Sequence, residues 1–241
     1  MHFISEQRLD NGGVERTFSL NDIPGILWTS GSSPAPLILL GHPGGLHRMY
    51  PRLAKRAQGA LASGCAAATI ELPGSGDRPR LADLERARAD LHRALVAGQP
   101  VDDIVDRLLT PLVETAVPEW QSALDALLSL PELTGPVGYS GGVIAIGVRL
   151  ALVEPRIGAA GLFAGSFVPQ STFDEARRIM IPLHVLLQWD DEANDRRQAL
   201  DLFDAFGSKE KTLHANMGGH TGVPDYAGED AARFFARHLR R

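Results

Sequence analysis

The stretch "VGYSGGVIAIG", residues 137–147, sets a single serine among glycines and just ahead of an apolar run. Residues 138–142 fit the pattern Gly-x-Ser-x-Gly, which is typical of a sharp strand-to-helix turn that projects a serine oxygen from the edge of an α/β sheet. Glycines suit such a turn because the serine backbone is strained and its neighbours approach it closely. A structural glycine turn is the alternative. We predict that Ser140 is a nucleophile, because a strand is expected before it and a helix after it.

Short apolar runs alternate with segments of helical period on both sides of this stretch. We expect strands at residues 23–30, 35–41, 65–72, 135–139, 157–165, 181–188 and 211–216. We expect helices at residues 50–63, from the Ser140 turn to about 153, at 173–180 and 194–206, and in a last segment that ends at Leu239. The turn signal Asn11-Gly12 predicts a hairpin near the N-terminus. This alternation predicts an α/β fold with a mostly parallel central sheet and helices on both faces.

One segment interrupts the alternation. Between Asp77 and Pro118, three stretches of helical period follow one another with no strand candidate between them. We therefore expect one domain, residues 1–241, with a helical cap insertion at residues 78–118. The apolar positions of the insertion either line a pocket or pack on the core, and periodicity does not separate these readings. They are Leu81, Leu84, Leu91, Leu95, Ile104, Leu108 and Leu109.

A nucleophilic serine needs a base, which in this architecture follows the last strand of the sheet. The stretch "HANMGGHTGVPDY", residues 214–226, has His220 between glycines, whereas His214 falls inside the expected strand. We predict His220 as the base; a mobile surface histidine is the alternative. The acid that orients the base should end the preceding strand, and spacing alone does not choose among the candidates. These are Asp190, Asp191 and Glu192.

The negative oxygen formed during acyl transfer needs two preorganised N–H donors. One comes from the residue after the nucleophile, Gly141, and the other from a loop after an early strand. That loop is "GHPGG", residues 41–45, where Pro43 has no N–H, so we predict Gly44 as the second donor. His42 and His47 lie nearby without a metal-binding motif, so we expect no metal and no cofactor.

Composition narrows the class of protein. With 44% hydrophobic and 22% charged residues, the 241-residue chain is expected to be soluble and globular. The formal net charge of −5 provides no basic surface for nucleic acid, so we expect a small-molecule partner. The single cysteine, Cys65, excludes an internal disulfide, and no signal peptide or membrane span is recognisable. We expect a cytoplasmic protein, as a monomer or a homodimer.

Five motifs in order resemble an α/β-hydrolase of the dienelactone-hydrolase-like esterase group, over nearly the whole chain. They are "GHPGG" at 41–45, "ELPGSGDRP" at 71–79, "GYSGG" at 138–142, "QWDDE" at 188–192 and "GGHTGVP" at 218–224. Members of this group usually carry Gly-x-x-Asp at the acid turn. Here Gln188 takes the place of that glycine, which selects Asp191 as the acid and leaves Asp190 as its rival. Dienelactone hydrolase itself uses a cysteine where this chain has Ser140.

The resemblance implies a serine esterase that cleaves a carboxylic ester of a small molecule through a Ser-His-Asp triad and an acyl-enzyme. The expected partner is a small-molecule ester or thioester. Two alternatives remain open at this point. One is a thioesterase or acyltransferase that uses the same triad, and the other is a catalytically silent binding protein on the same scaffold.

Overall fold

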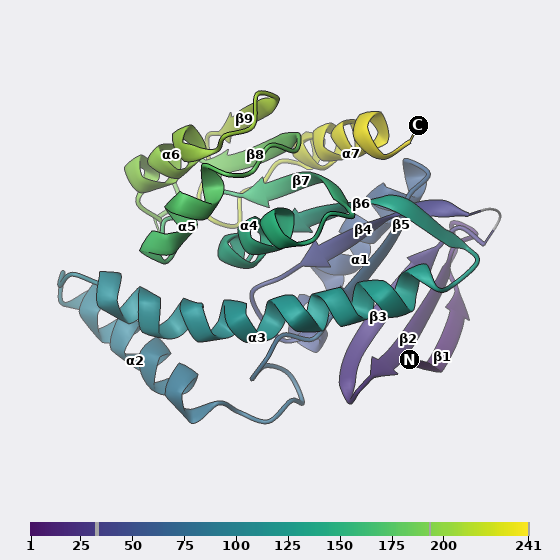
Figure 1. Cartoon of the computed structure of the whole chain (residues 1–241), viewed down its shortest axis with the longest axis horizontal. Coiled ribbons are helices and arrows are strands. Elements are labelled where there is room, and N and C mark those ends of the chain that lie inside the picture. The colour runs from purple at the N-terminus through teal and green to yellow at the C-terminus, as the bar shows by residue number, and fades with distance from the viewer. Residues whose placement is uncertain (32–33, 193, 241) are drawn as a thin grey trace.

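The computed structural model describes residues 1–31, 34–192 and 194–240, and within them nine strands form one sheet. The strands are β1 (His2–Arg8), β2 (Val14–Leu20), β3 (Ile23–Thr29), β4 (Ala35–Gly41), β5 (Ala66–Ile70), β6 (Leu133–Gly141), β7 (Ile157–Phe163), β8 (Leu183–Gln188) and β9 (Lys211–Asn216). The helices are α1 (Leu46–Ala62), α2 (Ala82–Val96), α3 (Asp102–Leu128), α4 (Ile144–Val153), α5 (Gln170–Ala176), α6 (Arg196–Ala205) and α7 (Asp225–Leu239). Figure 1 shows their arrangement.

The sheet is mostly parallel, with an antiparallel portion at its N-terminal side. Its strand order is β1-β2-β3-β5-β4-β6-β7-β8-β9. The first three strands form an antiparallel meander that joins β5, and every pair from β5 to β9 is parallel. Parallel strands present their carboxyl ends at one edge, and ligand sites of open α/β sheets lie at that edge. The predicted nucleophile lies in the last residues of β6, and the predicted oxyanion loop, acid and base follow β4, β8 and β9, so all are at this edge.

Helices cover both faces of the sheet, as expected for parallel strands buried on both sides. On one face, α1 and α7 pack through Leu53, Ala57 and Phe235 onto β4 and β7. On the other, α3 to α6 pack onto β6, β7 and β8, with Trp120 and Tyr139 in contact there. In Figure 1, α1 lies behind the sheet and α3 in front of it. Gly138 lets α7 approach closely, because a Cβ there would lie 2.8 Å from the Phe235 ring.

The insertion contains two helices rather than the three expected from its sequence. The second and third predicted stretches belong to α3, which continues through Pro111 and Pro118 to Leu128. An internal proline costs a helix about 3 kcal/mol, but α3 buries an apolar face along most of its length, which offsets that cost. The expected boundary at residue 118 therefore falls inside a helix. The Arg78 guanidinium fastens the start of the insertion to α3 through two hydrogen bonds to Glu119, at 2.6 and 2.7 Å.

His184 is a buried titratable group in the sheet. Its side chain in β8 lies against His214 of β9, with ring centroids 4.5 Å apart, and against Phe234 of α7 at 5.6 Å. Burial first, and then the neighbouring His214, lower the pKa of His184 to about 4, while the Asp230 carboxylate acts in the opposite direction. His184 is therefore neutral in the folded protein at pH values where the unfolded chain is protonated.

This difference predicts a loss of stability on mild acidification. The contribution of His184 is fully present above its unfolded pKa of 6.5 and is lost as pH falls toward 4, because the unfolded chain then binds the extra proton. We expect the free energy of unfolding to fall by about 2 kcal/mol between pH 7 and pH 5 through this group. Urea unfolding at both pH values should show a smaller fall for His184→Leu. The control His92→Asn, on the exposed side of α2, should keep the parent's fall, and equal falls in all three proteins would contradict the prediction.

Candidate active site

Ser140 lies at the carboxyl end of β6, followed by the turn into α4. Its neighbour Tyr139 faces α3, where its ring meets Trp120 edge-on at 6.4 Å. The turn is strand–turn–helix, as predicted, but its left-handed backbone is at Gly141, with φ of +114°, and not at Ser140. A Cβ on Gly141 would lie 2.5 Å from the Gly41 carbonyl oxygen, so only glycine fits there. The unusual backbone conformation expected at the serine thus occurs at the following glycine, which has no Cβ and adopts it readily.

A guanidinium that the motifs did not indicate holds the Ser140 hydroxyl. Arg56 of α1 donates from Nη2 to Ser140 Oγ at 3.1 Å and to the Ser140 carbonyl, and from Nη1 to the Gly41 carbonyl at 2.9 Å. It thereby ties the carboxyl ends of β4 and β6 together. Desolvation lowers the pKa of Arg56 to about 10, which leaves the group cationic at neutral pH. No sequence signal singles it out, because it is one of several basic residues on an amphipathic helix.

His220 and Asp191 form a hydrogen-bonded pair after β9 and β8. Nδ1 of His220 lies 2.8 Å from Oδ2 of Asp191, whose side chain is 3% exposed, and the Phe163 ring packs edge-on against the imidazole at 5.5 Å. Asp190 instead donates its backbone N–H to the Gly218 carbonyl at 3.1 Å. The structure therefore brings Asp191, rather than its rival, to the imidazole.

Gln188, which stands where the Gly-x-x-Asp pattern has its glycine, supports the loop that carries His220. Its side chain is buried and donates from Nε2 to the Gly219 carbonyl at 3.0 Å. That carbonyl also accepts the Gly222 N–H at 2.9 Å, which closes the turn around His220. The Gln188 side chain is larger than a glycine, and its amide forms a direct hydrogen bond to the loop that carries His220. The sequence marks the substitution but not its partner.

Ser140 and His220 are not hydrogen-bonded to each other in this conformation. Among the residues that the structure describes, no hydrogen bond links the Ser140 hydroxyl to His220. The serine oxygen instead accepts a hydrogen bond from Arg56. Such bonds in ligand-free enzymes often tighten only when substrate binds. The site therefore consists of a formed His-Asp pair and a serine held by a cation.

The loop after β4, residues 41–45, is anchored by buried polar groups from β5 and the segment that follows it. Nε2 of His42 lies 2.9 Å from the Ile70 carbonyl, and burial lowers the pKa of His42. The buried Glu71 carboxylate accepts the Leu46 N–H at 2.9 Å at the start of α1. These contacts support the backbone on both sides of Gly44. His42 and the "ELPGSGDRP" segment therefore hold the loop in place.

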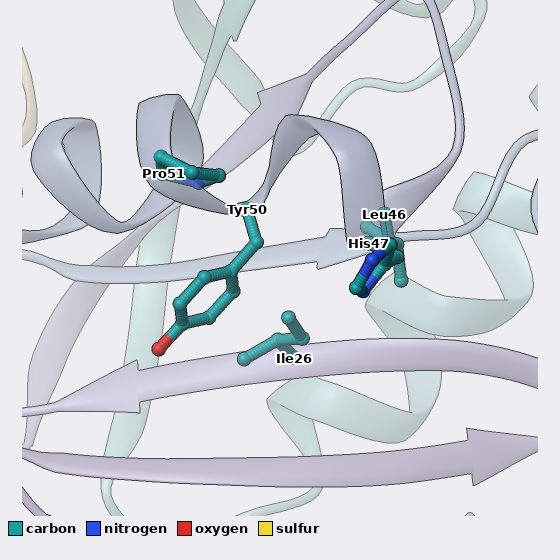
Figure 2. Close-up of a pocket in the computed structure, with 5 residues that line it drawn as sticks. All are labelled: Ile26, Leu46, His47, Tyr50 and Pro51. Carbon is teal, nitrogen blue, oxygen red and sulfur yellow. The ribbon is translucent and has the colours of Figure 1, made fainter.

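A cavity of about 460 Å³ adjoins this loop, between the first turns of α1 and strand β3. Figure 2 shows the five side chains that line it: Ile26, Leu46, His47, Tyr50 and Pro51. The Tyr50 hydroxyl donates to the Glu15 carboxylate at 2.9 Å, so one wall of the cavity is fixed by a hydrogen bond. Leu46 begins α1 two residues after Gly44, so this largely apolar space lies next to the predicted oxyanion loop.

No group of three or more His, Cys, Asp or Glu side chains is placed to hold a metal ion in residues 1–31, 34–192 and 194–240. Over the same residues, none of the helices has the length and apolar character needed to cross a bilayer.

Known structures resemble the whole chain, although no family model and no curated protein matches its sequence. A cold-adapted esterase from an Arctic intertidal metagenomic library is 26% identical, with a TM-score of 0.78 and 100% of both chains covered. Dienelactone hydrolase from Anabaena variabilis is 17% identical, with a TM-score of 0.62, over 98% of this chain and 99% of that one. Acetyl xylan esterase 1 from Thermoanaerobacterium is 10% identical, with a TM-score of 0.64, over 98% of this chain and 87% of that one.

The chain has the α/β-hydrolase fold, in the form found in esterases and in dienelactone hydrolase. Over its full length it is similar to the Arctic cold-adapted esterase in particular. These comparisons confirm the fold class and the resemblance stated from the sequence. The likeness to the Arctic esterase also bears out the prediction of an enzyme that hydrolyses carboxylic esters. The distant members of this set show the fold alone.

Proposed function

We propose that the chain is a serine esterase that cleaves a small-molecule carboxylic ester with Ser140, His220 and Asp191. The observation that carries this proposal is the 2.8 Å contact between the His220 imidazole and the buried Asp191 carboxylate, at the same edge of the sheet as Ser140 near the end of β6. An acid in this place holds the tautomer of the imidazole whose other nitrogen accepts a proton. The chain order Ser, Asp, His is that of α/β-hydrolases.

In the proposed reaction, His220 removes the proton of Ser140 as Oγ bonds to the ester carbonyl carbon. The carbonyl oxygen becomes an oxyanion that the N–H groups of Gly44 and Gly141 bind. The carbon–oxygen bond to the alcohol then breaks, and the alcohol leaves with the proton from His220. Water activated by His220 attacks the acyl-enzyme, the carboxylic acid departs, and Ser140 regains its proton.

The surroundings of the site support a small organic substrate. The apolar cavity beside the loop of residues 41–45 has space for an acyl or alcohol group. The hairpin of α2 and α3 reaches beyond the end of the sheet where β6 gives way to α4 (Figure 1), and this supports the proposal that residues 78–118 form a cap. A free, buried Cys65 agrees with the proposed cytoplasmic location.

A fluorophosphonate probe tests the proposal directly, because it phosphonylates activated serines. The folded protein is expected to gain one phosphonyl group, which peptide mass spectrometry should place on Ser140. A parallel panel of p-nitrophenyl esters, thioesters and lactones should show turnover of the esters, and preferential turnover of thioesters would favour a thioesterase. A folded sample that neither takes the label nor hydrolyses any of the panel would indicate a silent scaffold.

A further inference from the structure

Asn194, just before α6, touches the acid of the proposed triad. Its Nδ2 donates to Asp191 Oδ2 at 2.7 Å. This is the same oxygen that His220 Nδ1 approaches at 2.8 Å. The imidazole and the Asn194 amide therefore contact the same carboxylate oxygen.

The orientation of the Asn194 amide is determined by Ser166, in the segment after β7. The Ser166 backbone N–H donates to Asn194 Oδ1 at 3.0 Å, and because an N–H only donates, the amide oxygen must face Ser166 and the nitrogen must face Asp191. The buried Ser166 hydroxyl in turn accepts the Asp195 N–H at 3.0 Å. A continuous chain of hydrogen bonds thus runs from the end of β7 through Asn194 to the acid.

We infer that Asn194, oriented by Ser166, is a positioning residue that sets the direction and charge of the Asp191 carboxylate and thereby the basicity of His220. This inference rests on the proposed function, in which His220 is the base. The amide donor draws negative charge toward itself on the shared oxygen. Without it, Asp191 presents more charge to the imidazole and its carboxylate turns more freely, so His220 becomes more basic and less well oriented.

The other residues near the His220 imidazole are left unchanged when Asn194 is substituted. Glu192 lies against the histidine loop, with Oε2 2.8 Å from the place a Cβ on Gly219 would take. Phe163 contributes an uncharged ring at 5.5 Å. Asp190 contributes its backbone to the same loop. A change that follows substitution of Asn194 alone therefore reports on the shared Asp191 oxygen.

The experiment compares Asn194→Ala and Asn194→Asp with the parent, using an NMR titration of the His220 ring and the pH dependence of kcat/KM. Both variants should move the titration midpoint and the acid limb of kcat/KM to higher pH. We expect roughly one pH unit for Asn194→Asp, which adds a second carboxylate beside Asp191, and a smaller shift for Asn194→Ala. We also expect kcat to fall about tenfold or more while KM changes little.

Two controls separate this role from a structural one. Ser166→Ala keeps the backbone N–H that orients the amide, so it should shift the midpoint less than either Asn194 variant. Gln198→Ala, on the exposed side of α6, should leave both measurements unchanged. Folded Asn194 variants with the parent's midpoint would overturn the inference even if the parent is an active esterase. A parent protein without esterase activity would contradict the proposed function instead. The NMR titration needs no turnover, so it would still show whether Asn194 acts on His220.

Discussion

Replacing Ser140 by alanine is expected to lower kcat for p-nitrophenyl acetate by about a millionfold. The change deletes only Oγ, the atom proposed to bond to the ester carbon. The Arg56 hydrogen bonds to the carbonyls of Ser140 and Gly41 involve the backbone and remain, so the ends of β4 and β6 stay joined. The loss should therefore appear in turnover and not in the circular dichroism spectrum or the unfolding midpoint. Long-time assays at high enzyme concentration measure the residual rate.

A matched control is Ser129→Ala, which removes an exposed serine hydroxyl at the end of α3. It should keep the parent's kcat and its labelling by the fluorophosphonate probe, whereas Ser140→Ala should take no label. A folded Ser140→Ala protein that hydrolyses the ester as fast as the parent would rule out the proposed nucleophile.

Asp191→Asn is expected to have the second largest effect, a loss of about 10⁴ in kcat at neutral pH. The amide keeps the size of the carboxylate but no longer stabilises the imidazolium and permits the wrong tautomer of His220. Asp190→Asn should retain activity within a few-fold, because Asp190 takes part through its backbone N–H, which the substitution leaves in place. Comparing kcat of the two variants distinguishes the candidates. A large loss in Asp190→Asn with an active Asp191→Asn would transfer the role of the acid to Asp190.

Much of the parallel half of the fold could be predicted from the sequence. The strands at residues 35–41 and 211–216 have the expected bounds, because compact apolar or alternating runs end there at Gly, Pro or polar residues. The continuity of α3 could not be predicted, since two internal prolines argue against it and only packing on the sheet offsets their cost. The place of β5 between β3 and β4 is likewise a consequence of tertiary pairing, which periodicity does not report.

Part of the candidate site could likewise be predicted from the sequence, and part could not. Ser140, Asp191 and His220 could be named because each sits in a short motif whose order along the chain follows the topology of the sheet. Arg56, Gln188 and Asn194 could not be assigned partners, because their contacts join elements that are distant in sequence or depend on one side-chain conformation. The resting contact of the Ser140 oxygen with Arg56 is of this kind.

The continuity of α3 has a mechanical consequence for access to the site. The same helix supplies one arm of the proposed cap and, further along, Trp120, whose ring meets Tyr139 next to Ser140. A lid that swung as one rigid body would have to bend α3 or pull Trp120 away from Tyr139. If residues 78–118 cap the site as proposed, opening over a substrate would involve α2 and the connection at residues 97–101, with α3 held in place by Trp120. Altering that connection would change the rate of substrate entry and product release without moving the nucleophile.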